Sequence, residues 1–481
     1  MRPILQRIET EHDPVSAARL LGPADLPVLL QSGGSNSGQS RFSFLTAFPL
    51  LNFESSGADC RWLDAAGEVT AQQFGSPWQL LGAQLARFEL VDGVDLPFPA
   101  GGAFGFWGYD LKQFVEPKLG RTALNDVDFP DCRVGFYPSL VIWDRQQGTV
   151  WILATGLHTD GSRTLAAAQA QFAHWQELLA VSAGPPSEQA AFSAIGQPAN
   201  STLDRPQFLS VLDKVRDYIR RGHIYQVNIA QRWTLPLAGS GWNLFERISE
   251  ISPAPFSAYQ AWDERALISV SPEQFLRLSD HHIRTRPIKG TRPRSLHSDE
   301  DARLSYELQS SEKERAELLM ITDLLRNDLG RICEFGSVTV PDLMRLERFS
   351  HVQHLVSTVE GRLRPDTTHL EAMAACFPGG SITGAPKFRA MQIIEELEPV
   401  ARGPYTGCLG YLGFNRESQL NILIRTAVVS GAKVHYHAGA GIVADSSPEA
   451  EYAETLVKAA AFFQALTARP TPATASQTPA Q

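Results

Sequence analysis

Apolar residues recur with two different periods along this chain, and the change from one period to the other separates predicted helices from predicted strands. Apolar residues three and four positions apart predict amphipathic helices, whereas short runs rich in β-branched and aromatic residues predict strands. The predicted helices span 163–180, 204–221, 311–328, 368–376, 386–398 and 448–468. The predicted strands lie in 26–50 (two strands joined by a Gly/Ser loop), 101–111, 135–155, 223–235, 265–279, 283–288, 403–413, 420–429 and 433–440. Long strands mixed with helices, without strict βαβ alternation, indicate an α+β fold with layered sheets.

Two segments show neither the helical nor the strand periodicity of apolar residues. The stretch 183–203 is rich in Pro, Gly and Ser, so we take 186–203 as a linker between an N-terminal region, 1–185, and a C-terminal region, 204–468. The last residues, 469–481, have low complexity and predict a disordered tail. No internal repeat is evident in the sequence.

Composition narrows the class of protein. The 481 residues, 43% hydrophobic and 20% charged, describe a soluble globular protein with one large domain or two ordinary ones. The net charge of -9 argues against a nucleic-acid-binding protein, which needs a basic face. The charged N-terminus predicts no signal peptide, and no apolar run approaches membrane-spanning length. Five scattered cysteines without metal-like spacing are typical of a reducing compartment, so we expect a cytoplasmic protein.

A single lysine in a basic stretch is the first candidate for chemistry. Residues 284–294 read RTRPIKGTRPR, with Lys289 where a strand-like run breaks into a turn. A strand end holds the base of a side chain while the loop leaves room for a ligand. A lysine can act there as a nucleophile if it is uncharged, which burial or neighbouring cations favour. The alternative is a solvated, charged strand edge.

Two helices carry paired carboxylates. Glu314 and Glu317 share one helical face, and Glu451 and Glu454 repeat the spacing on the last helix. Each pair alone is typical of a solvated surface, but the adjoining apolar sequence draws both helices inward. Four converging carboxylates repel one another unless a cation lies among them. Oxygen ligands with a position open to substrate suit Mg²⁺.

A glycine-rich turn, PGGSITGAPK at 378–387, precedes another predicted helix. Its glycines free backbone N–H groups to face an anion at the helix N-terminus. The ending Gly-Ala-Pro-Lys differs from a phosphate-binding loop, so nucleotide binding is not supported. A carboxylate ligand and a plain helix-entry turn both remain open.

Taken together, these stretches resemble the chorismate-utilising enzymes, which include the anthranilate, aminodeoxychorismate, isochorismate and salicylate synthases. The resemblance runs from about Leu29 to Ala468 and is densest after residue 204. It is carried by GHIYQVNIAQR (222–232), SPEQFL (271–276), RPIKGTRPR (286–294), ERAELLMITDLLRNDLGR (314–331), HLVSTVEG (354–361), PGGSITGAPKFRAMQII (378–394), LNILIRTA (420–427) and AGAGIVADSSPEAEYAE (438–454). It implies a layered sandwich of two large, mostly antiparallel sheets flanked by helices, with a chorismate-binding catalytic region at 204–468.

Within that family, Lys289 separates the branches. The anthranilate, isochorismate and salicylate branches carry alanine there, and the last two place a water-activating lysine where this chain has Gln226. The PIKGT form is that of the aminodeoxychorismate branch. The resemblance therefore implies that ammonia replaces the ring hydroxyl of chorismate to give 4-amino-4-deoxychorismate, the first step towards 4-aminobenzoate and folate. Anthranilate formation is the nearest alternative, and a catalytically silent regulatory subunit is a second one.

The resemblance also implies roles for individual residues. Lys289 would be the nucleophile and Glu273 the general acid and base, with His354 as the family's active-site histidine. Mg²⁺ would lie beside Glu317 and Glu454. The remaining matched positions are Glu314 and Glu451 behind the metal and, for binding substrate, Thr383, Gly384, Ala385, Tyr405, Arg425, Gly441 and Lys458.

Ammonia has to come from another chain. A glutamine amidotransferase needs Gly-x-Cys-x-Gly and a later His-x-Glu, but Thr406 stands in the first glycine position before Cys408. The His-x-Glu sequence at His369 precedes the cysteine. We therefore expect a heterodimer with a glutamine amidotransferase subunit.

The N-terminal region matches the part of the family that holds a tryptophan pocket. Relatives place Leu-Leu-Glu-Ser where this chain has glutamine at Gln31, followed by Ser32. That difference favours the aminodeoxychorismate pattern, in which a bound tryptophan at Ser32 would be structural.

Overall fold

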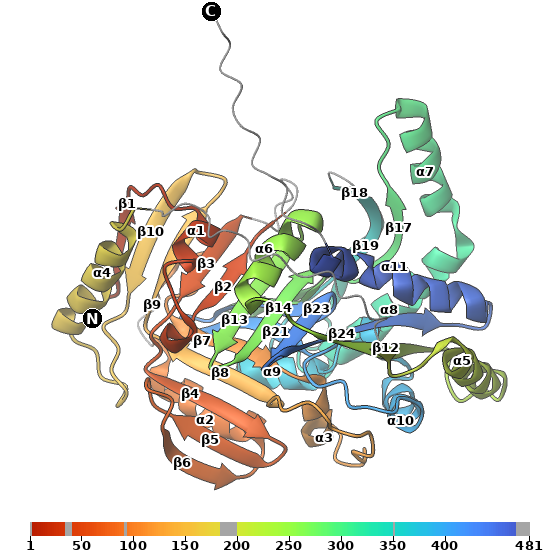
Figure 1. Cartoon of the computed structure of the whole chain (residues 1–481), viewed down its shortest axis with the longest axis horizontal. Helices are drawn as coiled ribbons and strands as arrows, with labels where there is room; N and C mark the ends of the chain where they lie inside the picture. The colour runs from red at the N-terminus through yellow and green to blue at the C-terminus, as the bar shows by residue number, and fades with distance from the viewer. Residues whose placement is uncertain (1, 34–40, 91–93, 183–199, 350–351, 468–481) are drawn as a thin grey trace, which may run out of the picture.

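The computed structural model describes residues 2–33, 41–90, 94–182, 200–349 and 352–467, which form two large antiparallel sheets with helices around them (Figure 1). In spatial order, the first sheet contains β1 (Ile4–Ile8), β10 (Thr149–Ala154), β9 (Ser139–Asp144), β3 (Phe42–Thr46), β2 (Val28–Gln31), β13 (Phe256–Trp262), β14 (Arg265–Ser271), β23 (Thr426–Ser430), β24 (Lys433–Ile442), β12 (Gln226–Pro236) and β11 (Asn200–Ser201), with β20 (Gly384–Ala385) paired to β12. The second contains β17 (Ile288–Pro293), β19 (Val352–Arg362), β16 (His282–Thr285), β15 (Gln274–Ser279), β22 (Glu417–Ile422), β21 (Cys408–Gly413), β7 (Gly102–Trp107), β8 (Cys132–Tyr137), β4 (Leu51–Ser56), β5 (Asp59–Leu63) and β6 (Val69–Phe74), with β18 (Thr339–Arg348) paired to β19. The α+β sandwich expected from the sequence is confirmed.

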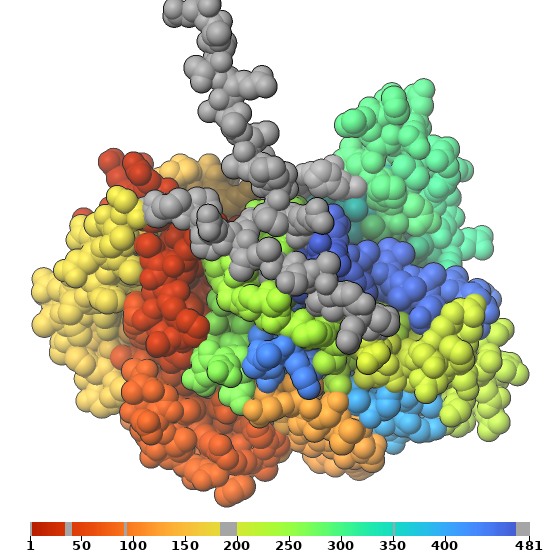
Figure 2. Space-filling view, in the orientation of Figure 1, coloured from red at the N-terminus to blue at the C-terminus, as the bar shows by residue number. Residues whose placement is uncertain are grey.

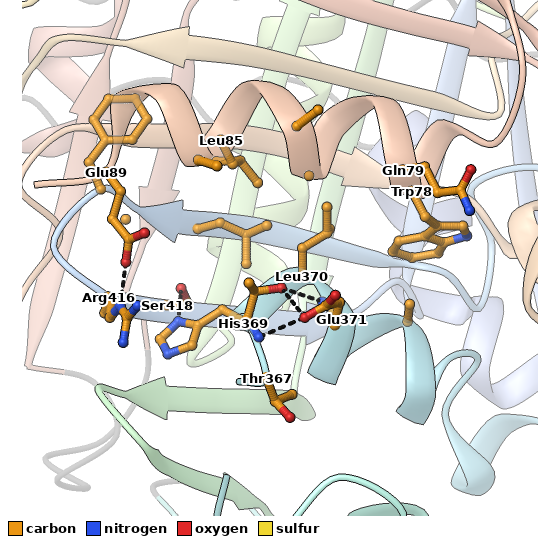
Figure 3. Close-up of a pocket in the computed structure, with 18 of the residues that line it drawn as sticks. Trp78, Gln79, Leu85, Glu89, Thr367, His369, Leu370, Glu371, Arg416 and Ser418 are labelled. Atoms are coloured by element: carbon orange, nitrogen blue, oxygen red, sulfur yellow. Dashed lines mark hydrogen bonds and ion pairs between the residues drawn. The ribbon is translucent and has the colours of Figure 1, made fainter. Parts of the chain in front are cut away.

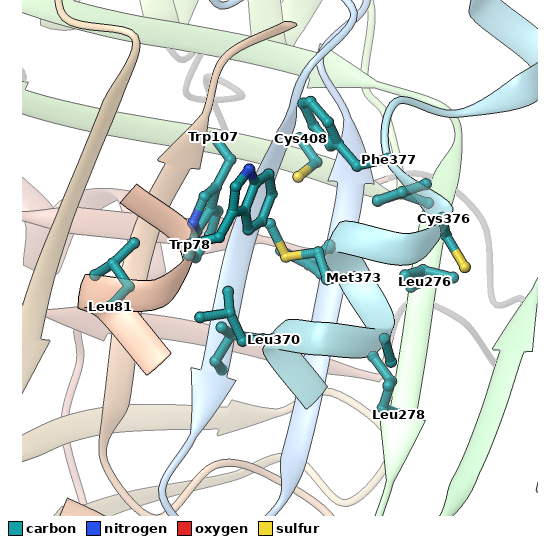
Figure 4. Packing of buried hydrophobic residues seen from close by; sticks show 14 of the residues in the cluster. Trp78, Leu81, Trp107, Leu276, Leu278, Leu370, Met373, Cys376, Phe377 and Cys408 are labelled. Carbon is teal, nitrogen blue, oxygen red and sulfur yellow. The ribbon is translucent and has the colours of Figure 1, made fainter. Parts of the chain in front are cut away.

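The sheets face each other across an apolar layer, and helices cover their outer faces. Phe44 and Ile142 of the first sheet meet Phe104 and Tyr411 of the second in one buried cluster. The outer face of the first sheet is covered by α1 (Pro14–Ala18), α4 (Leu165–Leu179), α6 (Gly241–Ile251) and α11 (Pro448–Thr467). On the second sheet, α2 (Pro77–Phe88), α8 (Glu312–Gly330) and α9 (His369–Cys376) pack through a core that includes Trp78 and Met373 (Figure 4). Burial of these apolar faces drives the layers together.

The remaining helices lie at the ends of the sheets. The helices α5 (Arg205–Arg220) and α10 (Lys387–Leu397) pack on β12 and β24, and the short α3 (Lys112–Val115) follows β7. Asp204 caps α5 as predicted, since its carboxylate accepts a hydrogen bond from the Gln207 N–H at 2.9 Å. The helix α7 (Ser298–Ser310) projects from the body of the molecule (Figure 2). None of the helices among the described residues has the length and apolar character needed to span a membrane.

Both sheets combine strands from the predicted N-terminal and C-terminal regions. In the first sheet β2 pairs with β13, and in the second sheet β7 pairs with β21. Most of the predicted linker lies outside the described residues, but Asn200 and Ser201 belong to β11. The predicted tail, 469–481, and the Gly/Ser loop, 34–40, also lie outside them.

Two segments that we predict as single strands instead cross from one sheet to the other. The predicted strand 265–279 divides at Pro272–Glu273 into β14 of the first sheet and β15 of the second. The predicted strand 420–429 divides at 423–425 into β22 of the second sheet and β23 of the first. The crossings lie side by side, because the Ile422 N–H donates to the Glu273 carbonyl at 3.0 Å. The two-residue period of a strand's side chains is the same in a continuous strand and in one that changes sheets, so the sequence cannot distinguish the two cases.

Other boundaries also differ from the predictions. Lys289 lies inside β17, after a break at 286–287, and not at the end of a strand 283–288. The predicted strand 403–413 begins only at Cys408, and residues 403–407 form turns. The helices α2, α6 and α7 were not predicted, whereas α4, α5, α8, α9, α10 and α11 lie within two or three residues of the predicted ranges.

Candidate active site

A cavity of about 530 Å³ opens beside the two crossings and gathers most of the predicted site residues. Its walls come from β12 and β24 of the first sheet, β17 of the second sheet, and the helices α8 and α11. The predicted residues that line it are Lys289, Glu273, His354, Tyr405, Arg425, Gly441, Lys458, Glu314, Glu317, Glu451 and Glu454. These positions run from Glu273 to Lys458 in the sequence, so only the fold brings them together.

Lys289 enters the cavity from β17. Its Nζ atom lies 3.6 Å from Glu317 Oε2, and its side chain is 17% exposed. The register of β17 against β19 shifts between Lys289 and Thr291, where Gly290 has a φ of +66°. This bulge re-aims the lysine relative to a regular strand.

The arginines around Lys289 do not gather on its amine. Arg286 is paired with Glu347, Arg292 with Glu314 at 3.8 Å, and Arg294 with Asp301 at 2.8 Å. The nearest charged partner of the lysine is therefore the carboxylate of Glu317. A reaction at this amine would require that Glu317 be engaged elsewhere.

Glu273 stands at the crossing between β14 and β15 and is 7% exposed. Burial raises the pKa of its carboxyl, and a hydrogen bond from Ser381 and the charges of Lys289 and Lys458 offset only part of this shift. A buried carboxyl with a raised pKa can hold a proton closer to neutral pH and release it during a reaction. These are the properties of a general acid and base.

The four carboxylates form one wall, and lysines lie among them. Lys313 Nζ lies 3.4 Å from Glu451 and 4.0 Å from Glu317, while Lys458 Nζ lies 2.7 Å from Glu454. Burial raises the pKa of Glu317 in spite of its lysine neighbours. For Glu454, burial acts in the same direction, but the charge and hydrogen bond of Lys458 outweigh it and the pKa is lowered.

The carboxylate oxygens of this wall have the chemistry that Mg²⁺ prefers. Nowhere in the described ranges, however, do three acidic, histidine or cysteine side chains meet closely enough to hold a metal ion. A metal bound here would displace the lysines from the carboxylates and take further oxygen ligands from substrate or water. The donor set fits the ion, whereas the present side-chain arrangement is paired with ammonium groups.

The cavity also contains cationic groups that are suited to an anion. Arg425 occupies the second crossing with a φ of +51°, and Lys458 Nζ also donates to the Gly439 carbonyl at 2.8 Å. The Tyr405 ring stacks on His437, with ring centres 5.0 Å apart. Arginine and lysine here can bind substrate carboxylates.

His354 reaches the cavity from β19. Its Nδ1 atom lies 3.0 Å from Thr291 Oγ1 and 3.2 Å from the Gly290 carbonyl. Burial lowers the pKa of the imidazole, so it is neutral at physiological pH.

Four predicted site residues lie outside the cavity lining. Thr383 is fully buried and its hydroxyl donates to the Gly379 carbonyl at 2.9 Å, while Gly384 and Ala385 form β20. The neighbouring Ser381 lines the cavity instead. Ser32 lies in β2's extension, far along the first sheet, where its hydroxyl donates to the Phe42 carbonyl at 2.6 Å. The roles of these four residues stay predictions, as do those of the predicted residues that line the cavity.

Several lining residues were not predicted from the sequence. Ser381, Asn228, Lys313 and His437 all line the cavity. Within the described part of the chain, Asn228 Oδ1 and His437 Nε2 are buried without a hydrogen-bond partner. Asn228 and Ser381 lie in stretches that carry the family resemblance, so those motifs are the only signal that could have identified them.

A second hollow of about 400 Å³ lies between α2 and α9, away from the predicted residues (Figure 3). His369 borders it, with one ring nitrogen 2.8 Å from Ser418 Oγ and the other 2.8 Å from the Asp280 carbonyl. Cys408 is buried in β21, which raises the pKa of its thiol. That glutaminase activity lies on another chain stays a prediction.

The family model described as chorismate binding enzyme matches residues 54–464. The chain belongs to this family.

Within this family, the chain is similar to both aminodeoxychorismate synthases and anthranilate synthases. The chain is 39% identical over 434 residues to aminodeoxychorismate synthase component 1 of Escherichia coli, covering 90% of this chain and 91% of that protein. It is 37% identical over 453 residues to anthranilate synthase component 1 of Bacillus caldotenax, covering 91% and 88%. Among solved structures, anthranilate synthase component I of Streptococcus pneumoniae has a TM-score of 0.76 at 29% identity, covering 90% of this chain and 94% of that one. The predicted family and fold are thereby confirmed.

Proposed function

We propose that this chain converts chorismate and ammonia into 4-amino-4-deoxychorismate and water. The observation that supports this branch of the family is the amine of Lys289, which projects into the cavity shared with Glu273 and Arg425. Several similar relatives are named aminodeoxychorismate synthase component 1. Relatives named anthranilate synthase component 1 are nearly as similar, so the choice depends on the lysine.

In the proposed mechanism, the neutral Lys289 amine forms a C–N bond to the ring while the C–O bond of the ring hydroxyl breaks. Glu273 gives its proton to that hydroxyl, which leaves as water. Ammonia then forms the second C–N bond and the bond to lysine breaks, which restores the amine. The product ammonium returns a proton to Glu273, so the cycle balances. Two easier substitutions replace one difficult substitution.

Mg²⁺ would be held by Glu317 and Glu454, with Glu314 and Glu451 behind them, and would supply charge to bind and polarise the dianionic substrate. The chain's own cations, Arg425 and Lys458, would bind carboxylate. If Glu317 bound another cation in place of Lys289, the Lys289 amine would lose this partner and be free to react. Ammonia would come from a separate glutamine amidotransferase subunit.

The decisive experiment incubates the purified chain with chorismate, MgCl₂ and ammonium salt at alkaline pH and identifies the product by mass. We expect 4-amino-4-deoxychorismate, and glutamine should replace ammonium only when an amidotransferase subunit is added. Anthranilate as the product would contradict the proposal, and the absence of turnover would favour a silent subunit.

Lys289→Ala tests the nucleophile in the same assay. We expect a loss of amination of about 1,000-fold or more with unchanged folding, because a covalent step loses its nucleophile. Lys433→Ala, which removes an exposed lysine from β24, serves as the control. Amination at full rate by Lys289→Ala would exclude the covalent route.

A further inference from the structure

Arg402 is a buried arginine behind the cavity wall, with a side chain 1% exposed. Its Nε and Nη2 atoms donate to the two oxygens of Glu398 at 2.8 and 2.7 Å. Nη1 donates to the Ile382 carbonyl at 3.1 Å and to Thr406 Oγ1 at 3.2 Å, and Nη2 donates to the Asn228 carbonyl at 2.8 Å. A guanidinium has five N–H groups, so every donor of Arg402 is used.

The three acceptors other than Glu398 belong to three separate segments of the cavity wall. Asn228 lies in β12 and itself lines the cavity, and Ile382 follows Ser381, whose hydroxyl bonds Glu273. Thr406 follows Tyr405, and its hydroxyl donates to the Tyr405 carbonyl at 2.6 Å. A single side chain therefore fixes the backbone beside three groups that face substrate.

Two further contacts hold this arrangement in place. The Arg402 guanidinium lies over the Tyr405 ring, 5.6 Å from its centre, and over the Tyr109 ring, 4.9 Å from its centre. Glu398, besides binding Arg402, accepts a hydrogen bond from the Ala230 N–H of β12 at 2.8 Å. The ion pair is thus anchored to the first sheet and cannot shift without breaking a strand contact.

We propose that Arg402 is a positioning residue, which sets Ser381 against Glu273 and holds Tyr405 and Asn228 at the cavity wall without touching substrate itself. The inference rests on the proposed function for its assignment of Glu273 as the acid and base. Lysine cannot replace this arginine, because an ammonium has three donors and cannot span the fork of Glu398 and three other acceptors at once.

Arg402→Lys is the main test, since it keeps the buried charge. In the ammonium-dependent assay we expect kcat to fall about 10- to 100-fold, with KM for chorismate changed less, because misplaced groups cost turnover. The limb of the pH–rate profile that reports Glu273 should move, since its bond from Ser381 is disturbed. Arg133→Lys is the matched control: Arg133 is also buried, bound to Glu54 at 2.6 Å and placed over a Trp262 ring, but in β8 outside the cavity lining.

Thr406→Val provides a milder second variant, because valine keeps the shape of threonine and removes one acceptor of Arg402. We expect kcat to fall about threefold to tenfold with the same movement of the pH limb. If Arg402→Lys does not fold, the result with Thr406→Val decides. Wild-type kcat and pH profile in the folded variants would overturn the inference, as would equal losses in Arg402→Lys and Arg133→Lys.

Failure of the inference is distinguishable from failure of the proposed function. Each variant is compared with the unaltered chain in the reaction that the unaltered chain catalyses. A different product from the unaltered chain would overturn the proposed function and leave the positioning by Arg402 testable in that reaction. The absence of turnover by the unaltered chain would overturn both before any variant is compared.

Discussion

At the scale of residues, the cavity depends on glycines as much as on charged groups. Gly439 and Gly441 lie on β24, where the side chains of neighbouring β12 approach closely. A Cβ atom on Gly439 would lie 2.4 Å from Asn228 Oδ1, and one on Gly441 would lie 2.5 Å from Gln226 Nε2. The two glycines therefore leave the space in which the amide groups and the Lys289 amine meet.

We predict that Gly441→Ala folds but loses activity. The added methyl group would displace the Gln226 amide and lie 3.7 Å from Lys289 Nζ, so kcat/KM for chorismate should fall about tenfold or more. The measurement is steady-state kinetics beside thermal unfolding. Gly330→Ala, in open space at the end of α8, is the control and should keep full activity. An active Gly441→Ala variant would show that this wall tolerates extra volume.

A second prediction concerns the hydroxyl that bonds Glu273. Removing it in Ser381→Ala takes away an interaction that lowers the pKa of the carboxyl, so this pKa should rise further above its usual value. The limb of the pH–rate profile controlled by Glu273 should then move to higher pH. Ser337→Ala, whose hydroxyl donates to the Glu334 carbonyl away from the cavity, should leave the profile unchanged. An unchanged pH–rate profile in Ser381→Ala would show that the Ser381 hydroxyl does not influence the pKa of Glu273.

At the scale of elements, the site is built where strands change sheets. Glu273 and Arg425 occupy the two crossings, and the backbone between β14 and β15 is bonded to that between β22 and β23. Residues at a crossing are released from the alternation of a strand, so their side chains can face the space between layers. The helices α8 and α11 then add the acidic wall from outside the sheets.

The helix α9 allows a prediction about pH and stability. Burial lowers the pKa of His369 to about 4, against 6.5 for an unperturbed histidine, so the folded protein holds this ring neutral. The unfolded chain takes up a proton below about pH 6.5, which favours unfolding as the pH falls towards 4. His369 should therefore cost up to about 3 kcal/mol of the free energy of unfolding over that interval.

Urea denaturation of His369→Gln at pH 7 and at pH 4.5 measures this effect. We expect the variant to lose less stability between the two pH values than the unaltered chain does. His297→Gln, at an exposed position before α7, should behave like the unaltered chain. If the free energy of unfolding changed equally with pH in all three proteins, His369 would not be responsible for the pH dependence.

At the scale of the whole molecule, neither sheet can be completed by one region alone. Each sheet contains strands of both regions, and they join in its interior, where β2 of the N-terminal region pairs with β13 and β7 pairs with β21. Removing either region would expose the edges and apolar faces of both sheets. The predicted regions are therefore expected to fold as one cooperative unit.

Separate production of 1–182 and 200–481 tests this expectation. Residues 200–481 alone should show no cooperative thermal transition, and the two pieces produced together should regain one. A chain cleaved at a protease site introduced between the two regions should keep both pieces together on gel filtration. Cooperative unfolding of 200–481 by itself would contradict the prediction.

Much of the architecture and many of the residues that line the cavity could be predicted from the sequence, because local periodicity specifies helices and because the motifs contain the polar side chains. The amphipathic patterns of α5, α8 and α11 are local properties, and the Asp204 cap can be identified within four residues. The identity of Lys289 as a candidate nucleophile likewise needs only the residues around it and the family resemblance.

Tertiary structure decided which groups meet. The crossings at Glu273 and Arg425, the pairing of Lys289 with Glu317, and the bonds of Arg402 to the Ile382 and Asn228 carbonyls join segments far apart in the chain. No pattern in the sequence encodes them, since a strand that changes sheets has the same period as one that continues. The sequence determines the charge and shape of each side chain. The distances between side chains that lie far apart in the chain are set only when the sheets and helices pack into layers.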